Sequence, residues 1–166
     1  MHLRNISLLH RYGGQILRSP GMQREKTWMQ HGTVSVYRHS LSVALMCLAL
    51  AHALRLRVNE RALVRGALLH DYFLYDWHEK DSSHRWHGFT HPKKALSNAR
   101  RDFDISPVEA DMIRCHMFPM VPHMPRCRES ALLCVADKLC AAAEVFGDRR
   151  KRLSGWMKKR LGGEKR

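Results

Sequence analysis

The chain of 166 residues is 45% apolar and carries a formal net charge of +14. This length and composition are typical of one globular domain that buries its own core. No window of 18 uncharged apolar residues occurs and the first residues lack a signal-peptide pattern, so we expect a cytoplasmic chain. The five cysteines include no CxxC pair, which argues against a disulfide framework and against a cysteine zinc cage.

Apolar residues recur at spacings of three and four almost throughout the chain, which predicts an all-α, single-domain helical bundle. The first helix is expected at residues 22–30, after a Ser-Pro-Gly breaker, and a long second helix at residues 34–54. Asn59 is expected to cap a third helix that ends near Asp76.

The second half of the chain predicts three more helices. Residues 77–90 are polar and are expected to form a loop, after which Thr90 caps a helix with Pro92 in its first turn. A capping box at residues 106–109 opens the next helix, which a segment with three prolines ends. The last core helix is expected at residues 130–146.

The positive charge lies mainly at the two ends of the chain. Residues 147–166 hold nine Lys or Arg against two acids, and residues 1–30 hold five against one. We therefore divide the chain into an N-terminal lead-in with the start of the first helix (1–27), a core domain (28–146) and a basic tail (147–166). The tail is expected to be frayed and solvated, and weak contact with nucleic acid or an anionic membrane is its alternative role.

Six His and Asp side chains fall on or beside the apolar faces of the predicted helices, on five separate helices. A carboxylate is costly to bury there unless it is paired or bound to a metal ion. Imidazole and carboxylate ligands together suit Mn, Fe or Co, and Mg and Zn are also compatible. In chain order the six residues are His39, His70, Asp71, His91, His116 and Asp137.

The ordered pattern H…HD…D resembles that of the HD-domain metal-dependent phosphohydrolases. His39, the His70–Asp71 pair and Asp137 match this pattern one by one. The segments QHGTVSVYRHSLSVA, RGALLHDYFLYDWH and ADKLCAA are also similar to segments that occur together in small bacterial HD proteins. The resemblance covers about residues 28–146 and implies a helical bundle of the HD-domain type.

The resemblance implies a site for two divalent metal ions. One ion would be held by His39, His70, Asp71 and Asp137, and the second by Asp71, His91 and His116. Asp71 would thus bridge the ions and serve the catalysis directly, with a metal-activated water as the nucleophile. The implied reaction is hydrolysis of a phosphoester in a nucleotide or related phosphorylated small molecule.

Two departures leave the substrate class open. Cyclic-dinucleotide phosphodiesterases of the family carry a lysine three residues after HD and a later GYP segment, whereas this chain has Leu74 and MFPMVPHMP. Hydrolases of the stringent-response alarmone carry a Glu-Asp pair shortly after HD, whereas in HDYFLYDW the only acid that follows HD is Asp76.

Binding a phosphate requires basic or polar side chains near the metal ions. Lys138, next to Asp137, is the first candidate for a catalytic contact with the phosphate. Lys94, His87 and His123 are further candidates for binding the substrate. The pattern leaves the oligomeric state undetermined.

Two alternative functions fit the same residues. Six ligands in the order H…HD…H…H…D also serve mixed-valence di-iron oxygenases similar to inositol oxygenase, and an O₂-dependent reaction would distinguish these. A non-enzymatic alternative is a metal-stabilised module whose basic tail binds nucleic acid or anionic lipid.

Overall fold

The computed structural model describes the backbone of residues 2–78 and 86–161, and their side chains except at positions 2, 31, 87 and 148–161. The described ranges contain seven helices and one small hairpin, which confirms the predicted all-α fold. In chain order these elements are α1 (His2–Leu17), α2 (Pro20–Arg24), β1 (Met29–His31), β2 (Val34–Ser35), α3 (Val36–Ala53), α4 (Glu60–Leu69), α5 (His87–Asp102), α6 (Pro107–Cys115) and α7 (Arg128–Leu161).

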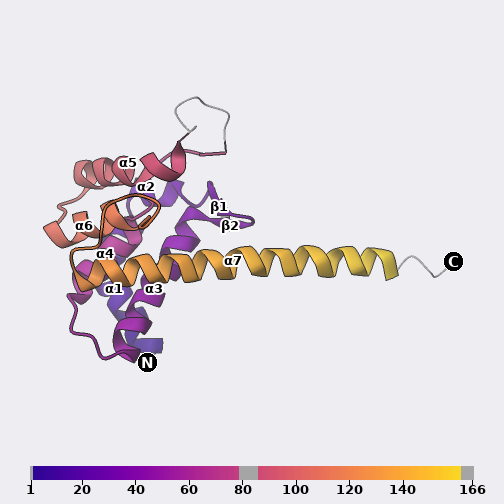
Figure 1. Ribbon diagram of the computed structural model, residues 1–166, viewed down its shortest axis with the longest axis horizontal. Coiled ribbons are helices and arrows are strands. Elements are labelled where there is room, and N and C mark those ends of the chain that lie inside the picture. Colours follow the sequence, from indigo (N-terminus) through magenta and orange to yellow (C-terminus); the bar gives the residue numbers. More distant parts are fainter. Residues whose placement is uncertain (1, 79–85, 162–166) are drawn as a thin grey trace.

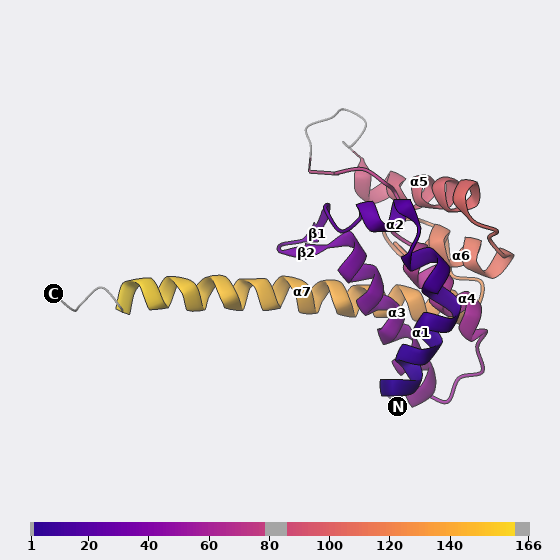
Figure 2. The ribbon, with the colours of Figure 1, turned by 180° about the vertical axis from the view of Figure 1, so that it is seen from behind.

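The helices α3 and α4 pack against each other at the centre of the molecule. α1 covers both of them, α7 lies along α3, and α6 packs between α4 and α5 (Figures 1 and 2). The core between these helices consists of fully buried aliphatic side chains such as Val43, Leu48, Leu63 and Ile113. Burial of such side chains supplies the main driving force for folding.

The N-terminal prediction was wrong, because a full helix precedes the expected one. α1 buries Leu9 and Ile16 against the core. A Cβ atom at Gly13 would lie 2.5 Å from Leu68 Cδ1, so the absence of a side chain lets α1 approach α4 closely. The expected helix at 22–30 is replaced by the short α2 and by strand β1.

A hairpin of β1 and β2 leads into α3. The strands are antiparallel, with Met29 opposite Ser35 and His31 opposite Val34. Gly32 provides the turn with a φ of 57°, a left-handed conformation that glycine adopts without steric cost. Ser35 then caps α3 by accepting a hydrogen bond from the backbone N–H of Arg38. The hairpin places Gln30 over the side chain of Asp71.

α4 starts as predicted, with Asn59 accepting a hydrogen bond from the backbone N–H of Ala62. The helix was predicted to continue to Asp76, but it ends at Leu69. His70 occupies the C-cap position and Leu74 has a φ of 61°, so the chain turns away immediately after the helix.

α5 begins at His87, earlier than the predicted start at Thr90. Trp86 is the N-cap residue, and the hydroxyl of Thr90 donates to its carbonyl from inside the helix. Pro92 therefore lies inside the helix and not in its first turn. The part of the predicted loop at residues 79–85 lies outside the described residues.

α6 and α7 complete the bundle. The predicted capping box is confirmed, with Ser106 accepting from the Glu109 backbone and the Glu109 side chain accepting from the Ser106 backbone. α7 was predicted to end at residue 146, but its backbone stays helical to Leu161 and continues well past the other elements (Figure 1). The predicted fraying of the basic tail is thus wrong up to residue 161.

The capping box yields a prediction about stability. Replacing Ser106→Ala leaves the N–H of Glu109 without its side-chain acceptor, so we expect the free energy of unfolding to fall by about 1 kcal/mol. Chemical denaturation of the two proteins measures this difference. Ser42→Ala is the matched control, since Ser42 is an exposed residue within α3, and it should leave the stability unchanged or raise it. An equal loss in both variants would contradict the role of the box.

Candidate metal centre

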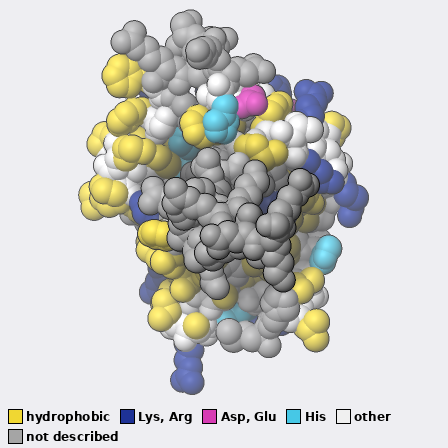
Figure 3. All heavy atoms as spheres, turned by 90° about the vertical axis from the view of Figure 1, so that its right-hand side faces the viewer, with side chains coloured by type: hydrophobic (Ala, Val, Ile, Leu, Met, Phe, Trp, Pro, Cys, Tyr) yellow, Lys and Arg dark blue, Asp and Glu magenta, His cyan; other side chains and the backbone are white. Residues whose placement is uncertain are grey.

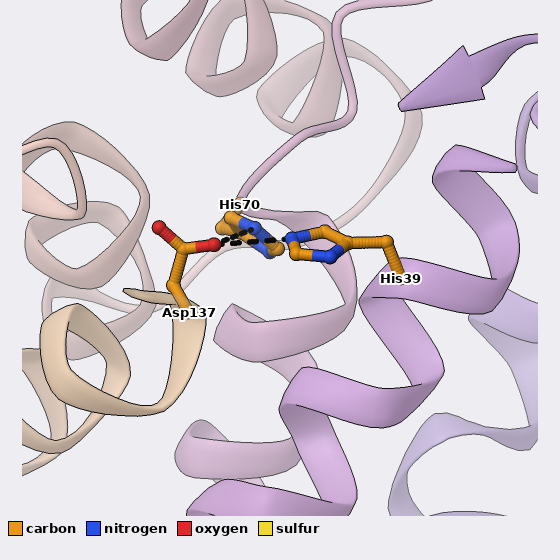
Figure 4. Close-up of side chains that lie close together, drawn as sticks. All are labelled: His39, His70 and Asp137. Atoms are coloured by element: carbon orange, nitrogen blue, oxygen red, sulfur yellow. Dashed lines mark hydrogen bonds and ion pairs between the residues drawn. The ribbon is translucent and has the colours of Figure 1, made fainter. Parts of the chain in front are cut away.

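His39, His70 and Asp137 come from three different elements and converge on one point (Figure 4). The Nε2 atoms of His39 and His70 lie 3.0 Å and 3.6 Å from the same oxygen, Asp137 Oδ1. His39 comes from α3, His70 from the end of α4 and Asp137 from α7. Their potential ligand atoms are close enough to share one metal ion.

Asp71 directs its two carboxylate oxygens toward two different sets of histidines. Oδ2 lies 3.3 Å from Nε2 of His70 and 4.0 Å from Nε2 of His39. Oδ1 lies 3.2 Å from Nε2 of His91 and 3.4 Å from Nε2 of His116. A carboxylate in this arrangement can bridge two metal ions, one on each side.

His91 and His116 form the other side of the centre. Their Nε2 atoms are 2.8 Å apart, so both rings face the same position. His91 belongs to α5, and His116 directly follows α6. His70, Asp71 and His116 form a second group with ligand atoms close enough for one ion.

All six predicted ligand residues are buried. The exposed fraction is 0% for His39 and His70 and rises only to 9% for Asp137. Burial this deep is costly for polar groups unless their ligand atoms are satisfied. The structure therefore brings together every residue of the predicted ligand set, although they are spread from position 39 to position 137.

Three of the rings are oriented by a hydrogen bond at the nitrogen that points away from the centre. Nδ1 of His70 donates to the carbonyl of Ala67, and Nδ1 of His116 donates to the carbonyl of Ile113, each at 2.8 Å. Both acceptors lie in the last turn of a helix, where carbonyls lack a helical partner. These bonds place the proton on Nδ1, which leaves Nε2 available to coordinate an ion.

His39 is oriented by a carboxylate instead of a carbonyl. Its Nδ1 donates to Oε2 of Glu144 at 3.0 Å, across from its contact with Asp137. Carboxylate partners of this kind fix the ring and make the opposite nitrogen a stronger ligand. Glu144 was missed in the sequence, although it lies seven residues after Asp137 and therefore on the same face of α7.

The carboxylates of the centre raise the pKa values of His39 and His70. Burial lowers the pKa of His39, but hydrogen bonds to Asp137 and Glu144 outweigh this effect and raise the pKa to about 9. Burial likewise lowers the pKa of His70, but the negative charges of Asp71 and Asp137 raise it well above its ordinary value.

The two aspartates behave in the opposite sense. Burial raises the pKa of Asp71, but the charge of His70 and the close imidazole nitrogens of His116 and His91 outweigh burial and hold it well below its ordinary value. The pKa of Asp137 is also lowered, because the hydrogen bond from His39 and the nearby charge of His70 outweigh the effect of burial. Both carboxylates thus stay ionised when a positive charge is beside them.

The donor set fits divalent metal ions. It combines imidazole nitrogens and carboxylate oxygens, the ligands that suit Mn, Fe, Co and Zn. His70 Nε2 and Asp71 Oδ1 are buried, and they have no hydrogen-bond partner among the described residues. Buried atoms of this kind are expected where an ion binds.

Two further polar residues near the centre were not predicted. Gln30 donates from Nε2 to Asp71 Oδ2 at 2.5 Å, and this contact depends on the hairpin, which the sequence pattern did not reveal. Glu25 is fully buried, and neither of its carboxylate oxygens has a hydrogen-bond partner within the described part of the chain. Burial, and after it the charge of Asp71, raise the pKa of Glu25 well above its ordinary value.

The four residues that were predicted to contact the phosphate or the substrate differ in their surroundings. Lys138 Nζ donates to the carbonyls of His116 and Cys134, so it lies directly behind a predicted ligand. Lys94 Nζ lies 4.4 Å from the centre of the Tyr75 ring. His123 accepts from Arg114 at 3.4 Å, and no contact in the described structure joins it to the six ligands. The side chain of His87 lies outside the described residues.

Comparison with known protein families matches residues 36–142 to the HD domain. The match covers more than half of the chain, so the protein belongs to the HD-domain family, a superfamily of metal-dependent hydrolases. Comparisons with curated proteins and with solved structures gave no match. Within the described ranges, no helix is both long and apolar enough to cross a membrane.

The position of Asp71 yields a prediction about metal content. We expect the purified chain to bind about two divalent ions, because the two Asp71 oxygens face separate sets of histidines. Asp71→Asn should lose both ions, whereas His116→Ala should keep one. Elemental mass spectrometry of protein purified without a chelating tag gives the ratio. Asp111→Asn, a carboxylate on α6 bonded to Ser130, is the control and should retain both ions.

The raised pKa of His39 yields a prediction about pH. Below a pKa of about 9 the ring carries a proton that a metal ion must displace, so metal affinity should increase as the pH rises from about 7 to about 9. Titration with Co²⁺ at several pH values measures the dependence. Glu144→Gln removes one of the bonds that raise this pKa, so it should move the dependence to lower pH. Equal affinity at every pH in this range would refute the expectation.

Proposed function

We propose that this protein is a phosphohydrolase that uses two divalent metal ions to cleave a phosphoester in a phosphorylated small molecule, of the nucleotide type. The observation that carries the proposal is the double role of Asp71, whose oxygens each lie within 3.4 Å of histidine nitrogens on opposite sides. Membership of the HD-domain family supports the same class of reaction.

The chain's own residues hold and orient the reacting groups. His39, His70, Asp71 and Asp137 would hold one ion, and Asp71, His91 and His116 the other. When bound, the ions supply Lewis acidity toward the phosphate and lower the pKa of a coordinated water. The hydrogen bonds at Nδ1 of His39, His70 and His116 keep these rings in one orientation, so little rearrangement is needed when substrate arrives.

Two cationic side chains, Lys138 and Lys94, are the candidates for contact with the phosphate. Lys138 follows the ligand Asp137 and contacts the backbone of His116, so its charge lies beside the centre. Lys94 is on the same helix as His91, and its ammonium group packs on Tyr75. Tyr75 is close enough to the centre for Asp71 to influence it, since burial and then the charge of Asp71 raise the pKa of Tyr75 to about 12.

A substrate panel tests the proposal. Wild-type protein loaded with Mn, Fe or Co is assayed for phosphate release from p-nitrophenyl phosphate and from nucleoside phosphates. We expect turnover that falls more than about 100-fold in Asp71→Asn, because changes at residues that only support a ligand already cost about 10- to 100-fold. Lys138→Gln should raise KM while the metal content stays unchanged.

Asp111→Asn serves as the matched control and should keep wild-type turnover, since its carboxylate contacts Ser130 and not the centre. Full turnover in Asp71→Asn would refute the proposal. So would a metal-loaded wild type that consumes O₂ with a substrate and releases no phosphate, which would indicate oxygenase chemistry at the same ligands.

A further inference from the structure

A cavity lies between α5, α6 and the segment that follows α6. Its volume is about 660 Å³, within the range of sites that hold small molecules. α5 contributes Leu96 and Arg100, and α6 contributes Val108, Asp111 and Arg114. None of the six predicted metal ligands lines this cavity.

The cavity is strongly cationic. Arg100, Arg114 and Arg126 line it, and a smaller adjoining cavity of about 270 Å³ shares Arg100 and Arg114 and adds Lys93. In the part of the chain that the structure describes, no carboxylate forms an ion pair with any of these four side chains. Arg114 instead donates to His123, which also lines the larger cavity.

One acid, Asp111, lines the same cavity, but its carboxylate has other partners. Asp111 Oδ2 accepts hydrogen bonds from the hydroxyl of Ser130 at 2.6 Å and from the backbone N–H of Arg126 at 3.0 Å. These bonds fix the segment after α6 against α7, so the acid supports the cavity wall. The remaining charge favours an anion, and guanidinium groups match the geometry of phosphate oxygens.

The rest of the wall is apolar, which narrows the class of ligand. The apolar contacts come from Leu96, Pro107, Val108, Pro122 and Met124. An inorganic anion alone would leave this surface without a contact. A molecule with one or two phosphates and an apolar or flat body would contact both parts of the wall.

We propose that this cavity is a second binding site for a phosphorylated small molecule with an apolar or aromatic body, such as a nucleoside diphosphate, held through Arg100 and Arg114. The site goes beyond the proposed hydrolase function, because its lining residues are separate from the metal ligands. It also gives His123 a role as a polar contact in this cavity.

Binding of adenosine 5′-(α,β-methylene)diphosphate to the full chain, measured by calorimetry, tests the proposal. The expected result is one saturable site per chain in addition to any binding at the metal centre, and the affinity of this site weakens at least about tenfold in Arg100→Gln/Arg114→Gln, since hydrogen bonds between charged groups dominate such sites. Pyrophosphate, which lacks the apolar body, should bind more weakly than the nucleotide analogue.

Two controls separate the cavity from general attraction by a basic chain. Lys and Arg side chains are visible at several places on the face shown in Figure 3, so anions can gather at many points. Arg11→Gln/Arg18→Gln removes the same charge from two exposed positions, one on α1 and one directly after it, and should leave the affinity within about twofold of wild type. Equal weakening in both double variants would overturn the proposal.

Repeating the titration with Asp71→Asn and with chelator-treated wild-type protein tests whether the nucleotide analogue binds at the metal centre instead of in the cavity. Unchanged affinity in both supports the second site even if the chain proves to have no hydrolase activity. Affinity lost in both would place the ligand at the metal centre and overturn the proposal. The proposal would also be overturned if a short single-stranded DNA displaced the analogue at a lower concentration than free nucleotide does, because the cavity would then be a binding site for nucleic acid.

Discussion

The buried carboxylate of Asp71 is the group on which the arrangement of the helices depends. It has only 2% of its surface exposed and is surrounded by four imidazoles from α3, α5 and the ends of α4 and α6. A charge buried this deeply would destabilise the fold unless opposite charge lay beside it. Four helices of the bundle therefore have to meet at this point, either through protonated histidines or through metal ions.

The positions at which α4 and α6 end also determine how the histidines of the centre are oriented. α4 stops directly before His70, and α6 stops directly before His116. In both cases the residue at the C-cap uses a carbonyl that the helix leaves without a partner three residues earlier. The same local rule therefore satisfies a carbonyl at two helix ends and orients two of the predicted ligands.

The helical fold and the six His and Asp residues that meet at the centre could be predicted, because most of the helices, and the polar residues on their apolar faces, are visible in the patterns of their own segments. The HD pair stood out as polar residues in an apolar run, and the capping box marked the start of α6. The hairpin was missed because strands of two and three residues are too short to show a periodicity. Gln30 therefore went unnoticed, since only the hairpin brings it to Asp71.

Other misses arose where tertiary contacts override local signals. α1 contains two adjacent glycines, which lower helix propensity, yet close packing of Gly13 on Leu68 favours the helix. His123 contacts Arg114 of α6, but its position between two prolines in the sequence does not indicate which helix it will contact. Glu144 could have been found, because a carboxylate two turns after Asp137 has to lie on the same side of α7.

The packing of α5 against α6 has a consequence for both sites. α5 carries His91 near its start and Arg100 near its end, while Arg114 in α6 lies two residues before His116. A change in the spacing of these two helices would alter the distance between His91 and His116, which is now 2.8 Å between Nε2 atoms, and would also change the width of the cationic cavity. The packing of α5 on α6 therefore positions both the His91–His116 pair and the arginine side chains of the cavity.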